Sequence, residues 1–114
     1  MQFVPSDHGR SSFIGQVRLD GTLVEAHGTP GDAADLNADD AIGGLFWQAS
    51  WWSWSPVVQQ RVRSAIERAS LGEVVRYDET LRLRGNRLAT IDVRWSPVVE
   101  ADIVTALVCS AIMR

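Results

Sequence analysis

At Gly72 the apolar residues of this 114-residue chain change from a helical spacing to that of a strand, and this change constrains the fold more than any other feature. Before Gly72 they recur every three or four positions, the period of a helix with one buried face. These residues are Val58, Val62, Ala65, Ile66 and Ala69. After Gly72 they alternate, from Val75 to Leu83 and again from Ala89 to Trp95, as in strands with one buried face. The second half of the chain is therefore predicted to be one helix followed by strands.

The ends of that helix carry their own signals. Ser55 is a suitable N-cap, and Pro56 suits the first helical position, where no N–H is needed. Gly72 is typical of the position just past a helix C-terminus. We expect a helix over residues 55–71.

Strands are predicted on both sides of the helix. Residues 11–19 and 22–27 form a predicted hairpin around Asp20-Gly21, because glycine adopts the positive φ of tight turns. Turns at 84–86 and 100–102 separate the later strands, and Pro97 is expected near the end of the fourth. The last strand, 103–113, is apolar on both faces, so we expect it to be central and covered on both sides.

The remaining segments complete a single predicted domain. Residues 1–10 are expected to be a partly ordered leader, and residues 28–40, rich in Gly, Ala, Asp and Asn, are predicted to form turns and short helices. The domain proper covers 11–114, a length that supports one hydrophobic core.

Composition excludes several classes of protein. The net charge of −3 argues against a nucleic-acid-binding domain, which usually has a basic surplus. One cysteine, Cys109, excludes an intrachain disulfide and any multi-cysteine metal site. The sequence has no signal peptide and no apolar run of bilayer length, so we expect a cytoplasmic protein with no membrane contact.

The order of elements, with four stretches of sequence, resembles the PAS domain family. The stretches are FIGQVRLDGTLVEAHG, IGGLFWQASWW, SPVVQQRVRSAIERASLGEVVRYDETLRL and IDVRWSPVVEADIVTALV. Gly44-Leu45-Phe46-Trp47 followed by Trp51-Trp52 is similar to one subgroup of bacterial signalling proteins.

This resemblance implies an α+β fold: a five-stranded antiparallel sheet of order 2-1-5-4-3, with short helices and one longer helix on one face. It also implies a sensory domain that binds a small ligand between sheet and helices, forms a homodimer, and relays to an effector in a longer chain. The effectors implied are a histidine kinase of a two-component system, a cyclic-dinucleotide enzyme or a helix-turn-helix transcription regulator. Many relatives end the last strand with Asp-Ile-Thr, whereas this chain has Ser110-Ala111-Ile112-Met113.

No cofactor or catalytic chemistry is evident. The cysteine motif of the flavin photosensors is absent, and we expect Cys109 to be structural. The predicted long helix has no histidine to serve as a haem ligand, and His8 and His27 alone make no metal site. No hydrolase triad, P-loop or dinucleotide-binding motif occurs, so we do not expect an enzyme.

Four of the five tryptophans lie within eight positions, 47–54, and could line an aromatic pocket for an apolar or aromatic ligand. The candidate ligand-binding residues are Trp47, Trp51, Trp52, Val62, Ile66, Tyr77 and Trp95. The alternative is that these side chains form the core, in which case the domain is a ligand-free module for dimerisation or docking. We expect Trp54, beside the helix cap, on the surface or at an interface.

Glu79 falls on the inward-facing side of its predicted strand, where an unpaired carboxylate costs several kcal/mol. We expect a bulge that turns Glu79 outward. The alternative is that Glu79 meets an arginine or a donor on a ligand.

Overall fold

A computed structural model of the chain describes residues 12–28 and 41–114. The predicted leader, and the turns and short helices predicted between 29 and 40, lie outside the described residues.

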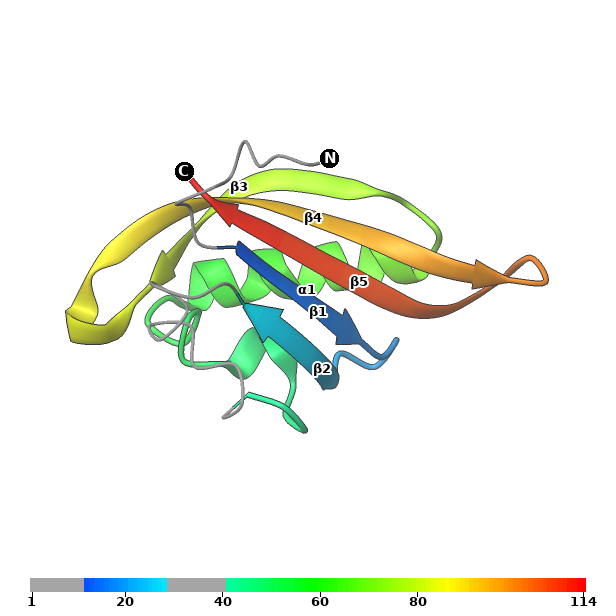
Figure 1. Cartoon of the computed structure of the whole chain (residues 1–114), viewed down its shortest axis with the longest axis horizontal. Coiled ribbons are helices and arrows are strands. Elements are labelled where there is room, and N and C mark those ends of the chain that lie inside the picture. Colours follow the sequence, from blue (N-terminus) through cyan, green and yellow to red (C-terminus); the bar gives the residue numbers. More distant parts are fainter. Residues whose placement is uncertain (1–11, 29–40) are drawn as a thin grey trace, which may run out of the picture.

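The described residues form one five-stranded antiparallel sheet in the order β2-β1-β5-β4-β3 (Figure 1). Its strands are β1 (Ser12–Val17), β2 (Leu23–Gly28), β3 (Val75–Arg82), β4 (Leu88–Glu100) and β5 (Ile103–Met113). This topology confirms the predicted α+β fold class and the central place of the last strand.

The α-helix of the described residues, α1 (Pro56–Ser70), has the two ends predicted for it. Ser55 caps the N-terminus, where its Oγ accepts the amide of Val58 at 3.2 Å. At the other end Gly72 adopts a φ of 101°. The Gly72 amide donates to the Ala69 carbonyl at 2.9 Å and the Glu73 amide donates to the Arg68 carbonyl, which together satisfy the last turn of the helix.

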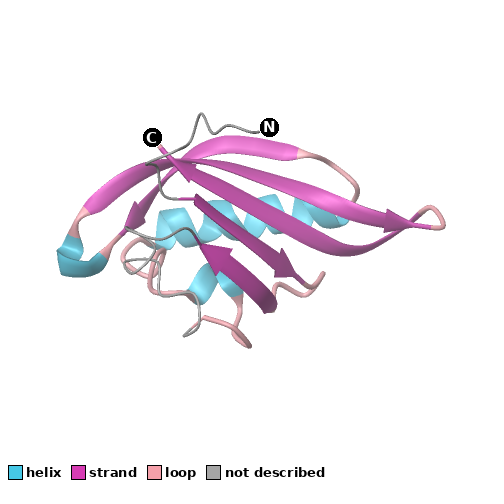
Figure 2. Cartoon of the chain, in the orientation of Figure 1, coloured by secondary structure: helices cyan, strands magenta, loops and turns pink. Residues whose placement is uncertain are grey.

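The helix covers one face of the sheet, and the core lies between them (Figure 2). The apolar helical face predicted from the sequence is buried throughout. On β5 the inward residues Leu107 and Cys109 are buried, whereas the outward residues Val108 and Ile112 are only half-buried. The prediction that both faces of this strand are covered is therefore wrong for the described part of the chain.

The fourth strand continues past Pro97, where the sequence predicted its end. It pairs with β5 as far as Glu100, but with β3 only as far as Trp95. Pro97 therefore lies along a free edge, where a missing N–H breaks no bond to β3. The hairpin closes through Ala101 and Asp102, which have positive φ values of 50° and 66°.

Backbone hydrogen bonds hold the aromatic segment against the first hairpin. The Leu23 amide donates to the Gly44 carbonyl and the Phe46 amide donates to the Gly21 carbonyl, at 2.9 and 2.8 Å. The Trp47 ring packs on Gly21, whose φ is 99° and where a Cβ atom would overlap the ring. Glycine at this position thus serves both the turn and the packing of the 3-10 helix η3 (Phe46–Gln48).

Candidate functional site: an aromatic cluster around a small apolar cavity

Five aromatic rings gather between the sheet and the helical segments. Phe46 lies at their centre, with ring-centroid distances of 5.8 Å to Trp51 and Trp52, 5.4 Å to Trp95 and 6.1 Å to Phe13. Most of these contacts are edge-on or tilted, the arrangement that aromatic rings favour. The Arg82 amide donates to the Trp51 carbonyl at 3.0 Å and fixes this segment to the end of β3.

One small cavity lies within this cluster. Its volume for a water-sized probe is about 20 Å³. The side chains around it are all apolar: Phe13, Phe46, Trp51, Trp52, Leu81, Ile91, Cys109, Ala111 and Met113. Such a space holds about one water molecule, and an apolar lining offers water no partner. Pockets for drug-sized ligands typically measure about 300–1,000 Å³. The space among these nine side chains is therefore far smaller than a pocket for a drug-sized ligand.

The structure brings together only part of the predicted ligand site. Trp51 and Trp52 line the cavity. Trp95 is fully buried and contacts Phe46, while Val62 and Ile66 belong to the core face of α1, and none of these three lines the cavity.

Trp47 and Tyr77 lie elsewhere. Trp47 is half-buried, and the guanidinium carbon of Arg63 lies 5.0 Å from its ring centroid, a cation–π contact. Tyr77 lines a surface groove between α1 and β3. Burial, helped by nearby Glu79, raises the pKa of the Tyr77 hydroxyl, which keeps it a neutral donor.

Sequence reasoning missed seven cavity residues: Phe13 on β1, Phe46 on η3 and five residues from the inward rows of β3, β4 and β5. Leu81, Ile91, Cys109, Ala111 and Met113 supply more than half of the lining. Alternation predicted that Leu81 and Ile91 face inward, but it gave no inward row for the last strand, which is apolar on both faces, and it did not show which residues meet the tryptophans. Burial raises the pKa of the Cys109 thiol, so it stays protonated and packs as a small apolar group, the structural role expected for it.

Among the described residues the indole N–H groups of Trp52 and Trp54 are buried without an acceptor, and that of Trp95 lies near the Tyr77 hydroxyl without forming a well-aligned hydrogen bond. A buried donor left unpaired costs about 1–3 kcal/mol. Trp54 is half-buried and packs against the core, so its predicted surface position is only partly correct.

Glu79 points into the protein, and the expectation of a bulge that turns it outward is wrong. The β3–β4 register runs without a shift from Val75 to Arg82, and the Glu79 side chain is 1% exposed. Arg61 on α1 pairs with both of its carboxylate oxygens, at 2.9 and 2.8 Å. The alternative, that Glu79 meets an arginine, is the one observed.

Metal ligands do not gather in the described residues: no group of three or more His, Cys, Asp or Glu side chains could hold an ion there. His27 is exposed and lies 3.1 Å from Glu25. Residues 12–28 and 41–114 also contain no helix that is both long and apolar enough to cross a membrane.

The sheet order and the long helix that packs across one face of the sheet define a PAS-fold domain. No family model matches the sequence. The structure superimposes on the PAS-B domain of Drosophila melanogaster Cycle, solved with ethylene glycol bound, with a TM-score of 0.67 at 9% identity over 90% of this chain and 99% of that one. It also superimposes on VqmA bound to DPO, with a TM-score of 0.64 at 14% identity over 90% of this chain and 52% of that one.

In sequence the chain is similar to part of a signalling enzyme. It is 31% identical over 80 residues to the sensor histidine kinase TmoS of Ectopseudomonas mendocina, a match to 69% of this chain and 8% of that protein. The chain therefore spans less than a tenth of the length of this relative.

Proposed function

We propose that this chain is the regulatory PAS domain of a larger cytoplasmic signalling protein, and that it works by self-association rather than by enclosing a large ligand. The observation that supports this best is the interior. The aromatic cavity among the described residues, about 20 Å³, is too small for a metabolite, a flavin or a haem. The domain then acts through its surface and carries no catalytic step.

The outward face of the sheet is the surface proposed for self-association. Its central strands present an apolar stripe, defined by Ile14, Val108 and Ile112, of which Ile14 is 54% exposed. Charged side chains flank the stripe, with Glu25 and His27 on β2 and Arg94 and Asp92 on β4. A stripe on the middle strands can meet its own copy across a two-fold axis, which is how most homodimers associate.

The effector is proposed from the similarity to TmoS. Because the matched segment covers 8% of that kinase, we propose that the effector domain lies in the rest of such a protein. We propose a histidine kinase as the effector, with a cyclic-dinucleotide enzyme or a helix-turn-helix transcription regulator as the other outputs that the PAS fold serves.

Light scattering after size-exclusion chromatography tests self-association. We expect a dimer for the natural sequence and a monomer for Ile14→Glu, since a charge in the stripe opposes its burial. Val57→Glu, at a position 63% exposed on α1, is the matched control and stays dimeric. A natural chain that remains monomeric at high concentration would overturn the proposal.

A small-ligand sensor is the second candidate, favoured by the unpaired indole N–H groups of Trp52 and Trp95. A ligand with an acceptor atom could satisfy them if the aromatic segment moved. The candidate lining is then the predicted set, centred on Trp51 and Trp52. Native mass spectrometry and an absorbance spectrum on freshly purified protein decide: a co-purifying mass, or absorbance beyond the tryptophan band, supports the sensor.

A further inference from the structure

We infer that strand β3 couples helix α1 to the C-terminal residue Arg114 through two consecutive carboxylates, Asp78 and Glu79. Neighbouring residues of a strand point to opposite faces of the sheet. Glu79 faces α1, and Asp78 faces away from it on the outer surface, 55% exposed. This inference goes beyond the proposed self-association and does not depend on it, because every contact lies within one chain.

On the helix side of β3, the Glu79 carboxylate accepts three hydrogen bonds. Arg61 donates from Nε and Nη2 to the two oxygens of Glu79, at 2.9 and 2.8 Å. The Thr80 amide donates to the same carboxylate at 2.9 Å. Three donors thus define the position of a side chain that is 1% exposed, and they fix the orientation of β3 above the helix.

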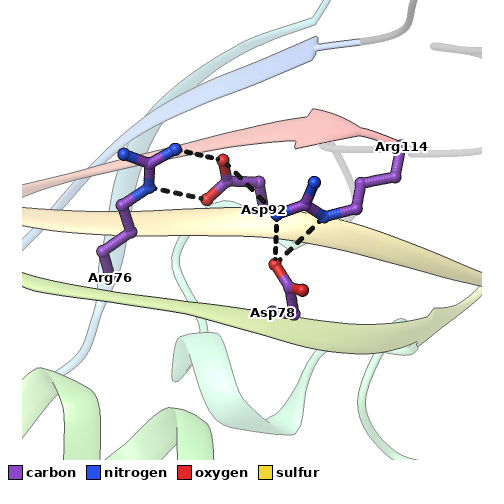
Figure 3. A network of polar contacts seen from close by, with 4 residues as sticks. All are labelled: Arg76, Asp78, Asp92 and Arg114. Carbon is purple, nitrogen blue, oxygen red and sulfur yellow. Dashed lines mark hydrogen bonds and ion pairs between the residues drawn. The ribbon is translucent and has the colours of Figure 1, made fainter.

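The outer contact holds Arg114, the residue that follows β5 (Figure 3). Arg114 donates from Nε and Nη2 to one oxygen of Asp78, at 3.1 and 2.7 Å. Its backbone amide donates to the Thr90 carbonyl on β4 at 3.1 Å. The residue that follows β5 is therefore attached to both β4 and β3.

The register of β3 and β4 explains why an arginine is needed beside Asp78. Asp78 and Asp92 lie directly opposite each other on β3 and β4, and like charges at such positions are destabilising. Arg76 pairs with Asp92 at 3.1 and 2.7 Å, and Arg114 pairs with Asp78 (Figure 3). Arg114 also lies 3.9 Å from Asp92, so it bridges the two carboxylates.

The coupling follows from the place of β3 at the edge of the sheet. Among the described residues β3 pairs with a single strand, β4, and at its other edge the Arg82 amide bonds to Trp51 near the strand end, so around Asp78 and Glu79 the twist of β3 about its own axis is restrained mainly by β4. If Arg61 is lost, the buried Glu79 carboxylate must turn toward water. That rotation moves Asp78, on the opposite face, away from Arg114. By linkage, releasing Asp78 loosens the Arg61–Glu79 pair to the same degree.

The side-chain Nε–H signals of Arg61 and Arg114 in NMR report each contact separately. We expect Arg61→Met to speed hydrogen exchange at the Arg114 Nε–H by roughly fivefold, the lower end of measured couplings between sites. Asp78→Asn should speed exchange at the Arg61 Nε–H by a similar factor. Asp78 is exposed, so this variant folds even if Arg61→Met does not.

Arg68→Met is the matched control. Arg68 also lies on α1, is similarly exposed and donates through Nε and Nη2 to one carboxylate, that of Glu73, which precedes β3. We expect no change at the Arg114 Nε–H in this variant. The proposal is overturned if Asp78→Asn leaves exchange at the Arg61 Nε–H unchanged, or if Arg68→Met disturbs Arg114 as much as Arg61→Met does.

Discussion

Arg61 and Glu79 form an ion pair in which one partner is half exposed and the other is almost completely buried. The Arg61 side chain is 51% exposed and the Glu79 side chain 1% exposed. The pair joins the solvent-facing side of α1 to the inward side of β3. Because the two side chains differ in burial, removing one should change the free energy of unfolding more than removing the other.

Removing the arginine should cost more stability than removing the carboxylate charge. Arg61→Met leaves a buried carboxylate unpaired, and we expect a loss of about 3 kcal/mol, the lower end for broken buried pairs. Glu79→Gln leaves a guanidinium that water can solvate, so about 1 kcal/mol is expected. Urea denaturation of both variants measures the difference. Equal losses would contradict the asymmetry.

Asp92 should make the stability depend on pH in the acid range. The hydrogen bonds from Arg76 are the main cause that holds the pKa of Asp92 below its usual range. A folded-state pKa below the unfolded value contributes stability above about pH 4, and this contribution is lost as the pH falls through the folded pKa. In Asp92→Asn we expect lower stability at neutral pH and a shallower decline below about pH 4. Denaturant titrations across that range test this, and an unchanged acid slope would count against it.

Trp52→Ala separates the two candidate functions. The variant deletes a 3%-exposed indole from the aromatic cluster, and we expect a loss of about 3–5 kcal/mol in the free energy of unfolding. Trp52→Phe keeps a ring and should lose less. For the docking module these changes affect stability alone. For the sensor, both variants also lose the hydrogen-bond donor that would bind the ligand, so a ligand bound by the natural chain would bind more weakly.

The turn between β4 and β5 should be open to improvement. Ala101 and Asp102 both adopt positive φ, which costs an alanine about 1–2 kcal/mol. Replacing the pair by Asn-Gly, the residues favoured in such two-residue turns, should stabilise the domain by about 1 kcal/mol. Thermal unfolding of the Ala101→Asn/Asp102→Gly variant measures the gain. A lower midpoint would mean that the native pair makes a contact worth more than the backbone strain.

Local signals in the sequence determined both ends of α1 and the inward faces of the two alternating strands, β3 and β4. Ser55 and Gly72 act within a few residues of themselves, and an alternating strand buries one row whatever its partner is. The PAS fold followed from the order of these elements and from the resemblance of four stretches of sequence.

Only the tertiary structure decided which side chains meet. It placed Arg61 on Glu79, 18 positions away, where the sequence favoured a bulge. It put Trp51 and Trp52 at the cavity and Tyr77 in a groove outside it, although all three were expected in one site. Such contacts depend on strand register and on how the helix lies across the sheet. Interactions between distant residues set both, so no local pattern in the sequence encodes them.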